Sequence, residues 1–294
     1  MIIRKPIVAG RFYPASRQQA TAELEECLSV PFNTKNLPTR LVAGVVPHAG
    51  WICSGAVAGI VFGAFKAVEK QIDVFILFGA VHRLGTIHPA VFNAGEWETP
   101  LGPAVVDDSL AAKILKESTV FRPDHETHAL EHSLEVQVPF IRYLFPNAKI
   151  LPILVHPTPE TIEVGRAVAA VVRRENIHAV AVGSTDLTHY GPGYGFTPKG
   201  PGPEGLRWAK NVNDRGLLDR IEKMDPQAVL NYAEKTQSAC GPGAVAATIA
   251  YAQTLGADTV QTLEHVTSDE VLSKRFGEQS DDAVGYAGIV FGIK

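Results

Sequence analysis

The chain has 294 residues, 46% of them hydrophobic, and a formal net charge of -4. This length and apolar content allow a sizeable core to be buried, which excludes an intrinsically disordered protein. Acidic and basic residues are interspersed without a basic stripe, which argues against nucleic acid or an anionic membrane as the main partner.

Cysteine usage and the N-terminal segment indicate the cellular compartment in which we expect the protein. The three cysteines, Cys27, Cys53 and Cys240, are widely spaced and form no CxxC pair, so we expect reduced thiols. The first residues lack the apolar core of a signal peptide, and no window reaches the roughly 18 uninterrupted apolar residues of a membrane span. We therefore expect a cytoplasmic protein without a membrane span, and a single domain over residues 1–294.

Apolar periodicity predicts strands and helices that alternate along the chain. In the first part of the chain we expect a helix over 20–29 with Cys27 on its apolar side, a strand over 41–46, a helix over 54–70 capped by Ser54, a strand over 73–78 and short strands between 89 and 106. In the middle we expect a helix over 107–116, a helix over 124–144 kinked at Pro139, a strand over 149–155, a helix over 158–175 and a strand over 178–183. In the last part we expect helices over 206–223, from 225 onward and over 243–255, and strands over 259–266 and 284–293.

This alternation predicts an α/β fold, a three-layer α/β/α sandwich around a mixed, largely parallel sheet. Between the strand over 178–183 and the next helix lies a loop over 184–205, which holds six glycines and four prolines. Loops of this length in compact domains are commonly functional or mobile.

Polar side chains follow three of the predicted strands at the points where each strand ends. His48 follows the first of these strands, His82 the second, and Asp186 and His189 the third. Because the carboxyl ends of parallel strands share one crevice, we expect these side chains to converge. The sequence therefore predicts one polar site, built around a metal ion.

Cys240 lies in a Gly/Pro-rich turn just ahead of the predicted helix over 243–255. The helix dipole and free backbone amides there favour the thiolate, the form of cysteine that binds metals. Two imidazoles and one thiolate with other positions open suit a catalytic Fe(II) site better than a closed structural zinc site. The alternative is that Cys240 binds no metal and is present only because a small side chain fits the tight turn at the start of the helix.

Asp186 and His189 are candidates for an acid/base pair, in which the carboxylate fixes the tautomer of the imidazole. An Asx turn that caps the strand explains Asp186 equally well. The densest polar cluster, over 125–135, contains His128 and His132 in an HExH pattern rather than the HExxH of zinc hydrolases. We expect the side chains of this cluster to support neighbouring ligands by hydrogen bonds or to lie charged in solvent. His156, which follows another strand, is a further candidate for the site.

Six ordered segments together resemble the Memo family. They are Gly10–Pro14, Pro47–Gly50 with Ser54 and Gly55, Gly79–His82, Glu131–Glu135 with Pro139 and Phe140, Ser184–Tyr190, and Ala239–Gly241. They run through essentially the whole chain. The sequence departs from the family in Gly-Ala-Val-His around His82 and in Trp51, where a tyrosine is common.

The resemblance implies a fold like that of class III extradiol ring-cleaving dioxygenases, whose iron is held by two histidines and a glutamate. In Memo proteins a cysteine replaces the glutamate, so His48, His82 and Cys240 take the metal positions. The acid/base histidine and its aspartate fall on His189 and Asp186. A thiolate is softer and more easily oxidised than a carboxylate, so ring cleavage is not inherited automatically.

Three hypotheses follow for function. The first is a metal-dependent redox or dioxygenase-like enzyme that uses Fe(II), with Cu or Zn as alternatives, on a small aromatic or enediol-like substrate. The second is a non-catalytic adaptor whose pocket binds a peptide or a partner protein. The third, ranked last, is a zinc hydrolase built on the 125–135 cluster. The resemblance also implies a radical-SAM protein and an AMMECR-type protein as partners.

Overall fold

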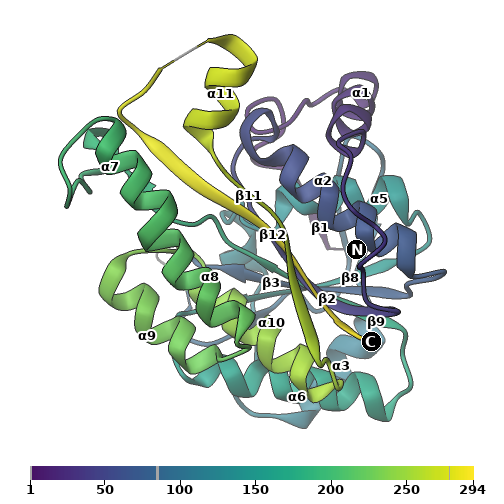
Figure 1. Ribbon diagram of the computed structural model, residues 1–294. Helices are drawn as coiled ribbons and strands as arrows, with labels where there is room; N and C mark the ends of the chain where they lie inside the picture. Colours follow the sequence, from purple (N-terminus) through teal and green to yellow (C-terminus); the bar gives the residue numbers. More distant parts are fainter. Residues whose placement is uncertain (1, 84–85, 278) are drawn as a thin grey trace.

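Four parallel strands form the middle of the sheet and bring their carboxyl ends to one edge. The computed structural model describes residues 2–83, 86–277 and 279–294. In the sheet, β2 (Arg40–Val46), β9 (Ala179–Ser184), β3 (Val74–Ala80) and β8 (Lys149–Val155) lie side by side in that order and run parallel. Strands that are far apart in the sequence are therefore neighbours in space (Figure 1).

Antiparallel strands complete both sides of this parallel centre. The outer strands are β12 (Ala283–Ile293), which pairs with β2, β11 (Thr259–Thr267) and β10 (His189–Tyr190), and on the far side β4 (Ala90–Val91) and β7 (Arg122–Pro123). A second, small sheet joins β1 (Ile3–Arg4), β5 (Glu96–Trp97) and β6 (Ala104–Val105). The predicted mixed, largely parallel sheet is confirmed.

Helices cover both faces of the sheet. They are α1 (Arg17–Leu28), α2 (Trp51–Val68), α3 (Asp108–Glu117), α4 (His125–Ala129), α5 (Val138–Leu144), α6 (Glu160–Arg174), α7 (Pro203–Trp208), α8 (Arg215–Glu222), α9 (Pro226–Thr236), α10 (Pro242–Thr254) and α11 (Ser268–Phe276), with the 3-10 turns η1 (Glu135–Gln137) and η2 (Pro192–Tyr194) and the π-helical segment η3 (Ala209–Asp214). One face packs on α10 with α6 and α9 behind it, and the other on α2 with α1 and α5 (Figure 1).

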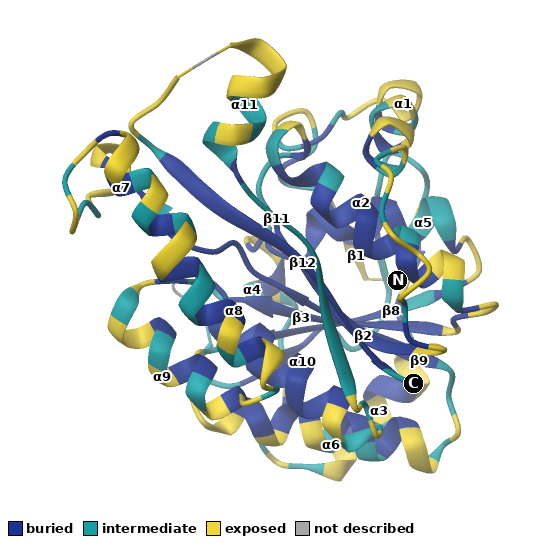
Figure 2. Cartoon of the chain, viewed as in Figure 1, coloured by how far each residue is buried: buried dark blue, intermediate teal, exposed yellow. Residues whose placement is uncertain are grey.

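Side-chain alternation along the strands explains the two cores. In β3, Ile76 and Phe78 pack into the core beneath α6 and α10, whereas Phe75 and Leu77 pack into the core beneath α2 and α5. Successive strand residues point to opposite faces, so a strand covered on both faces is apolar throughout. The central strands are accordingly buried, and exposed residues gather on the outer helix faces (Figure 2).

Helix α2 is long and apolar enough, by length and composition, to cross a membrane. Within this fold 61% of it is buried, because it packs on β2 and β12. It therefore behaves as a core helix. The predicted capping role of Ser54 is wrong: Gly50 is the N-cap, and the Ser54 hydroxyl donates a hydrogen bond to Ala49 O at 2.9 Å one turn inside the helix.

The predicted helix over 124–144 is interrupted. Only α4 and α5 are α-helical there, and residues between them form turns and η1. In a continuous helix the carbonyl of His128 would accept the amide of His132. Here the guanidinium of Arg4 donates to His128 O at 2.8 Å and to Glu131 O at 2.6 Å, while the His132 amide donates to the Glu131 carboxylate. Leu130, which follows the end of α4, is 56% exposed.

Arg4 also forms a buried ion pair that fastens the N-terminal segment to this interruption. Its Nη1 lies 2.8 Å from Oε2 of Glu135, and both side chains are 2% exposed. The Glu135 carboxylate further accepts the backbone amides of Ile7 and Val8 and the hydroxyl of Tyr13. A buried charge pair of this kind is tolerated because every charged atom is hydrogen-bonded.

Sequence reasoning missed α11 and the short strand β10 inside the loop over 184–205. The signal for α11 was present, since Thr267 and Glu270 form a capping box in which each side chain binds the backbone amide of the other residue.

Replacing Arg4 by methionine is expected to lower the free energy of unfolding by about 3–5 kcal/mol, because Glu135 is left as a buried, uncompensated charge. Urea denaturation followed by circular dichroism measures this loss. Lys5→Met is the matched control: its partner Glu98 is solvent-exposed, so the cost is at most about 1 kcal/mol. Equal costs for the two variants would contradict a structural role of the buried pair.

Candidate metal centre

One cavity of about 320 Å³ opens at the carboxyl edge of the sheet. All five predicted site residues line it: His48, His82, Asp186, His189 and Cys240. They come from the ends of β2, β3 and β9, from β10 and from the turn before α10. Adjacent parallel strands thus deliver side chains from distant parts of the sequence to one place.

The His48 imidazole is held in one tautomer by the end of β9. The Ser184 hydroxyl donates its hydrogen to Ser133 O at 2.6 Å, so its oxygen must accept from Nδ1 of His48, which lies 2.9 Å away. The protonated Nδ1 leaves the lone pair on Nε2, the arrangement that a metal-binding histidine needs. Burial, reinforced by His82 and His132, lowers the pKa of His48 well below its ordinary value, so the ring stays neutral.

The Cys240 sulfur faces this lone pair. Its Sγ lies 3.2 Å from Nε2 of His48 and accepts a hydrogen bond from the Asp186 amide at 3.3 Å. The following residue, Gly241, permits this close approach of α10 to β9, because a Cβ there would lie 2.5 Å from Ser184 O.

The expected thiolate at Cys240 is a prediction that the structure corrects. Burial raises the pKa of the Cys240 thiol above its ordinary value, and the nearby Asp186 carboxylate adds to the effect. The cost of removing a charge from water outweighs the amide hydrogen bond at the helix entry. The protein without an ion therefore holds a thiol, and a metal must displace its proton.

A single buried carboxylate, Glu131, orients the imidazole of His82 and lies beside that of His132. It accepts the amide of His82 at 2.7 Å and Nδ1 of His82 at 3.0 Å, and its Oε1 lies 3.3 Å from Nδ1 of His132. Burial alone would raise the pKa of Glu131, but hydrogen bonds from His82 and from the Ser133 amide hold it below its ordinary value. The carboxylate therefore stays charged, and Nε2 of His82 is left for the cavity.

Donor atoms around the cavity form two groups of three that share His48. His48, His82 and His132 form one group, and His48, Asp186 and Cys240 form the other; within each group the donor atoms lie within 4.8 Å of one another. The predicted ligands His82 and Cys240 thus belong one to each group. Sequence reasoning considered His132 as a donor only in the last-ranked zinc-hydrolase hypothesis and missed it at this cavity, because His132 was placed on a helix that the fold interrupts.

Asp186 and His189 line the cavity but are not joined by a hydrogen bond among the described residues. Oδ1 of Asp186 accepts the His48 amide at 2.7 Å, and Nδ1 of His189 lies 3.1 Å from Leu187 O. The backbone carbonyl fixes Nδ1 of His189 as the protonated nitrogen and leaves Nε2 as a proton acceptor. Burial raises the pKa of Asp186, and the hydrogen bond from His48 opposes this rise.

The other sequence candidates do not reach the cavity. His128 is fully buried, and its Nε2 lies 3.0 Å from Ala90 O, so it does not pair with His132 on a helix face. Burial lowers the pKa of His128 to about 3. Nε2 of His156 lies within hydrogen-bonding distance of Thr86 O. The zinc-hydrolase arrangement of His128 and His132 is therefore absent from the described residues.

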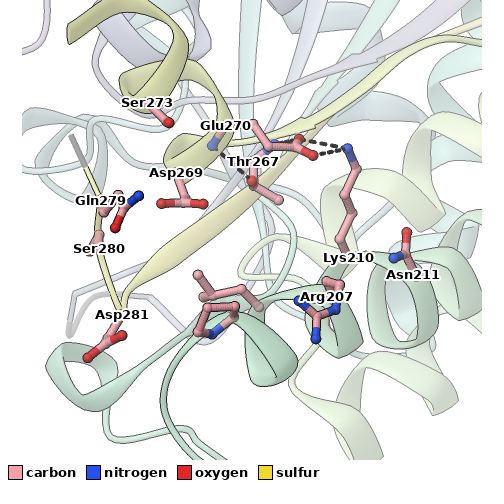
Figure 3. Close-up of a pocket in the computed structure, with 12 residues that line it drawn as sticks. Arg207, Lys210, Asn211, Thr267, Asp269, Glu270, Ser273, Gln279, Ser280 and Asp281 are labelled. Atoms are coloured by element: carbon pink, nitrogen blue, oxygen red, sulfur yellow. Dashed lines mark hydrogen bonds and ion pairs between the residues drawn. The ribbon is translucent and has the colours of Figure 1, made fainter. Parts of the chain in front are cut away.

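A second cleft, of about 590 Å³, lies between α7, η3 and α11 (Figure 3). Lys210 reaches across it to both carboxylate oxygens of Glu270 at 2.6 Å. Its described lining contains neither histidine nor cysteine. The imidazole and thiol groups that could hold a transition metal therefore lie at the sheet edge and not in this cleft.

An α/β fold whose parallel strands end in imidazole, carboxylate and thiol groups around one cavity defines a protein with a candidate metal centre. Residues 4–290 match the family model described as Memo-like protein. The chain belongs to the Memo family.

Relatives of full length support this assignment. A MEMO1 family protein from Pyrobaculum arsenaticum is 33% identical, and one from Thermococcus kodakarensis is 36% identical; each alignment covers 99% of both chains. Among solved structures, an uncharacterized protein, JW3007, from Escherichia coli K12 matches with a TM-score of 0.54 over 85% of this chain and 99% of that chain. At 13% identity this likeness concerns the fold alone, and the expected α/β fold is confirmed.

Removing the Ser184 hydroxyl is expected to change the tautomer of His48, because Nδ1 then loses its acceptor. Long-range nitrogen-15 NMR of metal-free protein should show Nδ1 of His48 protonated in the parent and Nε2 gaining proton occupancy in Ser184→Ala. Ser54→Ala, which removes a hydroxyl bound to a helix carbonyl, is the control and should leave the spectrum unchanged. A parent protein with Nε2 already protonated would refute the assigned tautomer.

Proposed function

We propose that this Memo-family protein is a metal-dependent redox enzyme whose non-heme iron is held by His48, His82 and Cys240. The observation that carries the proposal is the fixing of both histidines through Nδ1, which leaves each Nε2 for one cavity, with Cys240 Sγ 3.2 Å from Nε2 of His48. Neutral imidazoles and a thiolate form a donor set that suits iron and leaves coordination positions open. Copper and zinc accept the same donors and are the alternatives.

Iron bound there would supply one-electron chemistry and open positions for oxygen or for an oxygen atom of the substrate. The protein residues would supply orientation and proton transfer. We assign His189 as the group that accepts a proton from a substrate hydroxyl, since its Nδ1 is engaged by Leu187 O and its Nε2 is left as the acceptor. Asp186 supports the site by holding the His48 amide and by placing a carboxylate near His189.

The cavity dimensions and lining indicate the class of substrate. A volume of about 320 Å³ admits a small molecule, and the rings of Phe12, Tyr194 and Tyr286 form part of its wall. Tyr194 stands at 86° to the His189 ring, with the centroids 5.1 Å apart. We propose a small aromatic or enediol-like substrate whose hydroxyl reaches His189. On the family resemblance alone, we propose that the enzyme works together with a radical-SAM protein and an AMMECR-type protein.

Anaerobic reconstitution tests the proposed iron site. The wild-type chain is expected to take up about one Fe(II) ion and to form a nitric oxide adduct with the electron paramagnetic resonance signal of non-heme Fe(II), because positions on the ion stay open. Cys240→Ala should lose most of the Fe(II). Tight stoichiometric zinc, with no Fe(II) uptake and no nitric oxide adduct, would refute a redox role.

Loss of the proposed proton acceptor tests the enzymatic role separately. His189→Gln is expected to keep its iron but to slow oxygen uptake with a panel of catechols and enediols by about 100-fold or more. His88→Gln, which changes a histidine outside the cavity lining, is the control and should match the wild type. Unchanged turnover in His189→Gln, together with loss of binding to a partner protein, would favour the adaptor role instead.

A further inference from the structure

His132 is the residue at the cavity whose position the proposed ligand set leaves unexplained. Its side chain is 27% exposed and that of His82 26%, so both rings lie at the wall of the cavity rather than deep in a core. The ring centroid of His132 lies 5.5 Å from that of His48 and 5.0 Å from that of His82. Three imidazoles therefore meet around one point.

The three rings offer nitrogen donors at separations that an ion can bridge. One ring nitrogen from each lies within 4.8 Å of the other two. Metal–nitrogen bonds of about 2.0–2.1 Å bring the ligand atoms of one ion to roughly 3–4 Å from each other, so small side-chain rotations complete the arrangement. Among the described residues, no hydrogen-bond partner engages Nε2 of His82 or of His132.

The Glu131 carboxylate lies behind both His82 and His132, hydrogen-bonded to the ring of His82 and to the backbone amide of His132. Oε1 of Glu131 lies 3.0 Å from Nδ1 of His82 and 3.3 Å from Nδ1 of His132, and it also accepts the His132 amide. A carboxylate behind the imidazole is the usual support of metal-binding histidines, since it fixes the ring and strengthens the donor. A merely structural His132 gives no reason for sharing this carboxylate with His82.

We infer that His132 is a further metal ligand, and that His48, His82 and His132 form an all-nitrogen triad that holds a divalent transition metal even without the Cys240 thiol. The inference rests on the proposed metal site and adds a ligand to it. Imidazole suits zinc, copper, iron and nickel, and the affinity of a given site for divalent metals rises from iron through cobalt and nickel to copper. Cys240 is then an additional ligand that favours iron, rather than the residue on which all metal binding depends.

Anaerobic titration of the full chain with Co(II) tests the triad, because its visible absorption reports coordination geometry and a thiolate ligand adds a charge-transfer band. We expect Cys240→Ser to bind one Co(II) without this band. His132→Gln should keep the band but weaken the affinity for Co(II) by at least roughly 10- to 100-fold, the loss that follows when a residue hydrogen-bonded to a metal ligand is removed. The double variant should bind no Co(II) at the site, and His88→Gln should match the wild type.

A gain-of-signal variant separates ligation from a structural effect. In the Cys240→Ser background, His132→Cys is expected to restore a thiolate-to-cobalt band, which only a residue bonded to the ion can produce. Wild-type affinity in His132→Gln, or failure of His132→Cys to restore the band in a folded protein that binds Co(II), would overturn the inference.

The cobalt experiment depends on which residues hold an ion and not on redox chemistry. If the cobalt titrations show that His132 is not a ligand while the iron form reacts normally with nitric oxide, this inference alone is overturned. An intact triad in a protein without Fe(II) uptake or nitric oxide reactivity would overturn the proposed redox function alone.

Discussion

The buried guanidinium of Arg4 is the contact on which the geometry of the candidate site depends. By taking the carbonyls of His128 and Glu131, it ends α4 and frees the following amides to bind the Glu131 carboxylate. That carboxylate then orients the ring of His82 and lies 3.3 Å from Nδ1 of His132. The hydrogen bonds of Arg4, a residue of the small N-terminal sheet, thereby influence the cavity through the backbone geometry after α4. This influence does not require Arg4 itself to contact a candidate metal ligand.

Two kinds of sequence signal were sufficient to predict the fold and part of the candidate site. Strands such as β3 are apolar throughout because both faces are covered, and their ends are marked by polar residues, so the sheet edge that carries His48 and His82 could be predicted. The Gly/Pro-rich turn ahead of a helix marked Cys240 as a candidate ligand, and resemblance to a family also implied this role. These signals are local in the sequence or shared along the whole chain, and neither depends on knowing how distant segments pack.

Two of the errors have tertiary causes. The interruption after α4 depends on hydrogen bonds from Arg4, 127 positions away from Glu131, which leave no local pattern. The protonation state of Cys240 was misjudged because a helix entry is visible in sequence whereas burial is not. For α11 the capping box was legible and overlooked. The single domain, the identity of the metal and the partner proteins stay predictions from sequence and resemblance.

His48 and Cys240 are separated by 192 positions in the chain. Contacts of such sequence separation form slowly, since a long loop must close before the contact can stabilise it. The imidazoles of His48 and His82 follow β2 and β3, which pair through β9, and all three strands precede the thiol in the chain. Under the proposed ligand set, synthesis therefore supplies the nitrogen donors before the sulfur, and we expect the ion preference of the site to change as folding proceeds.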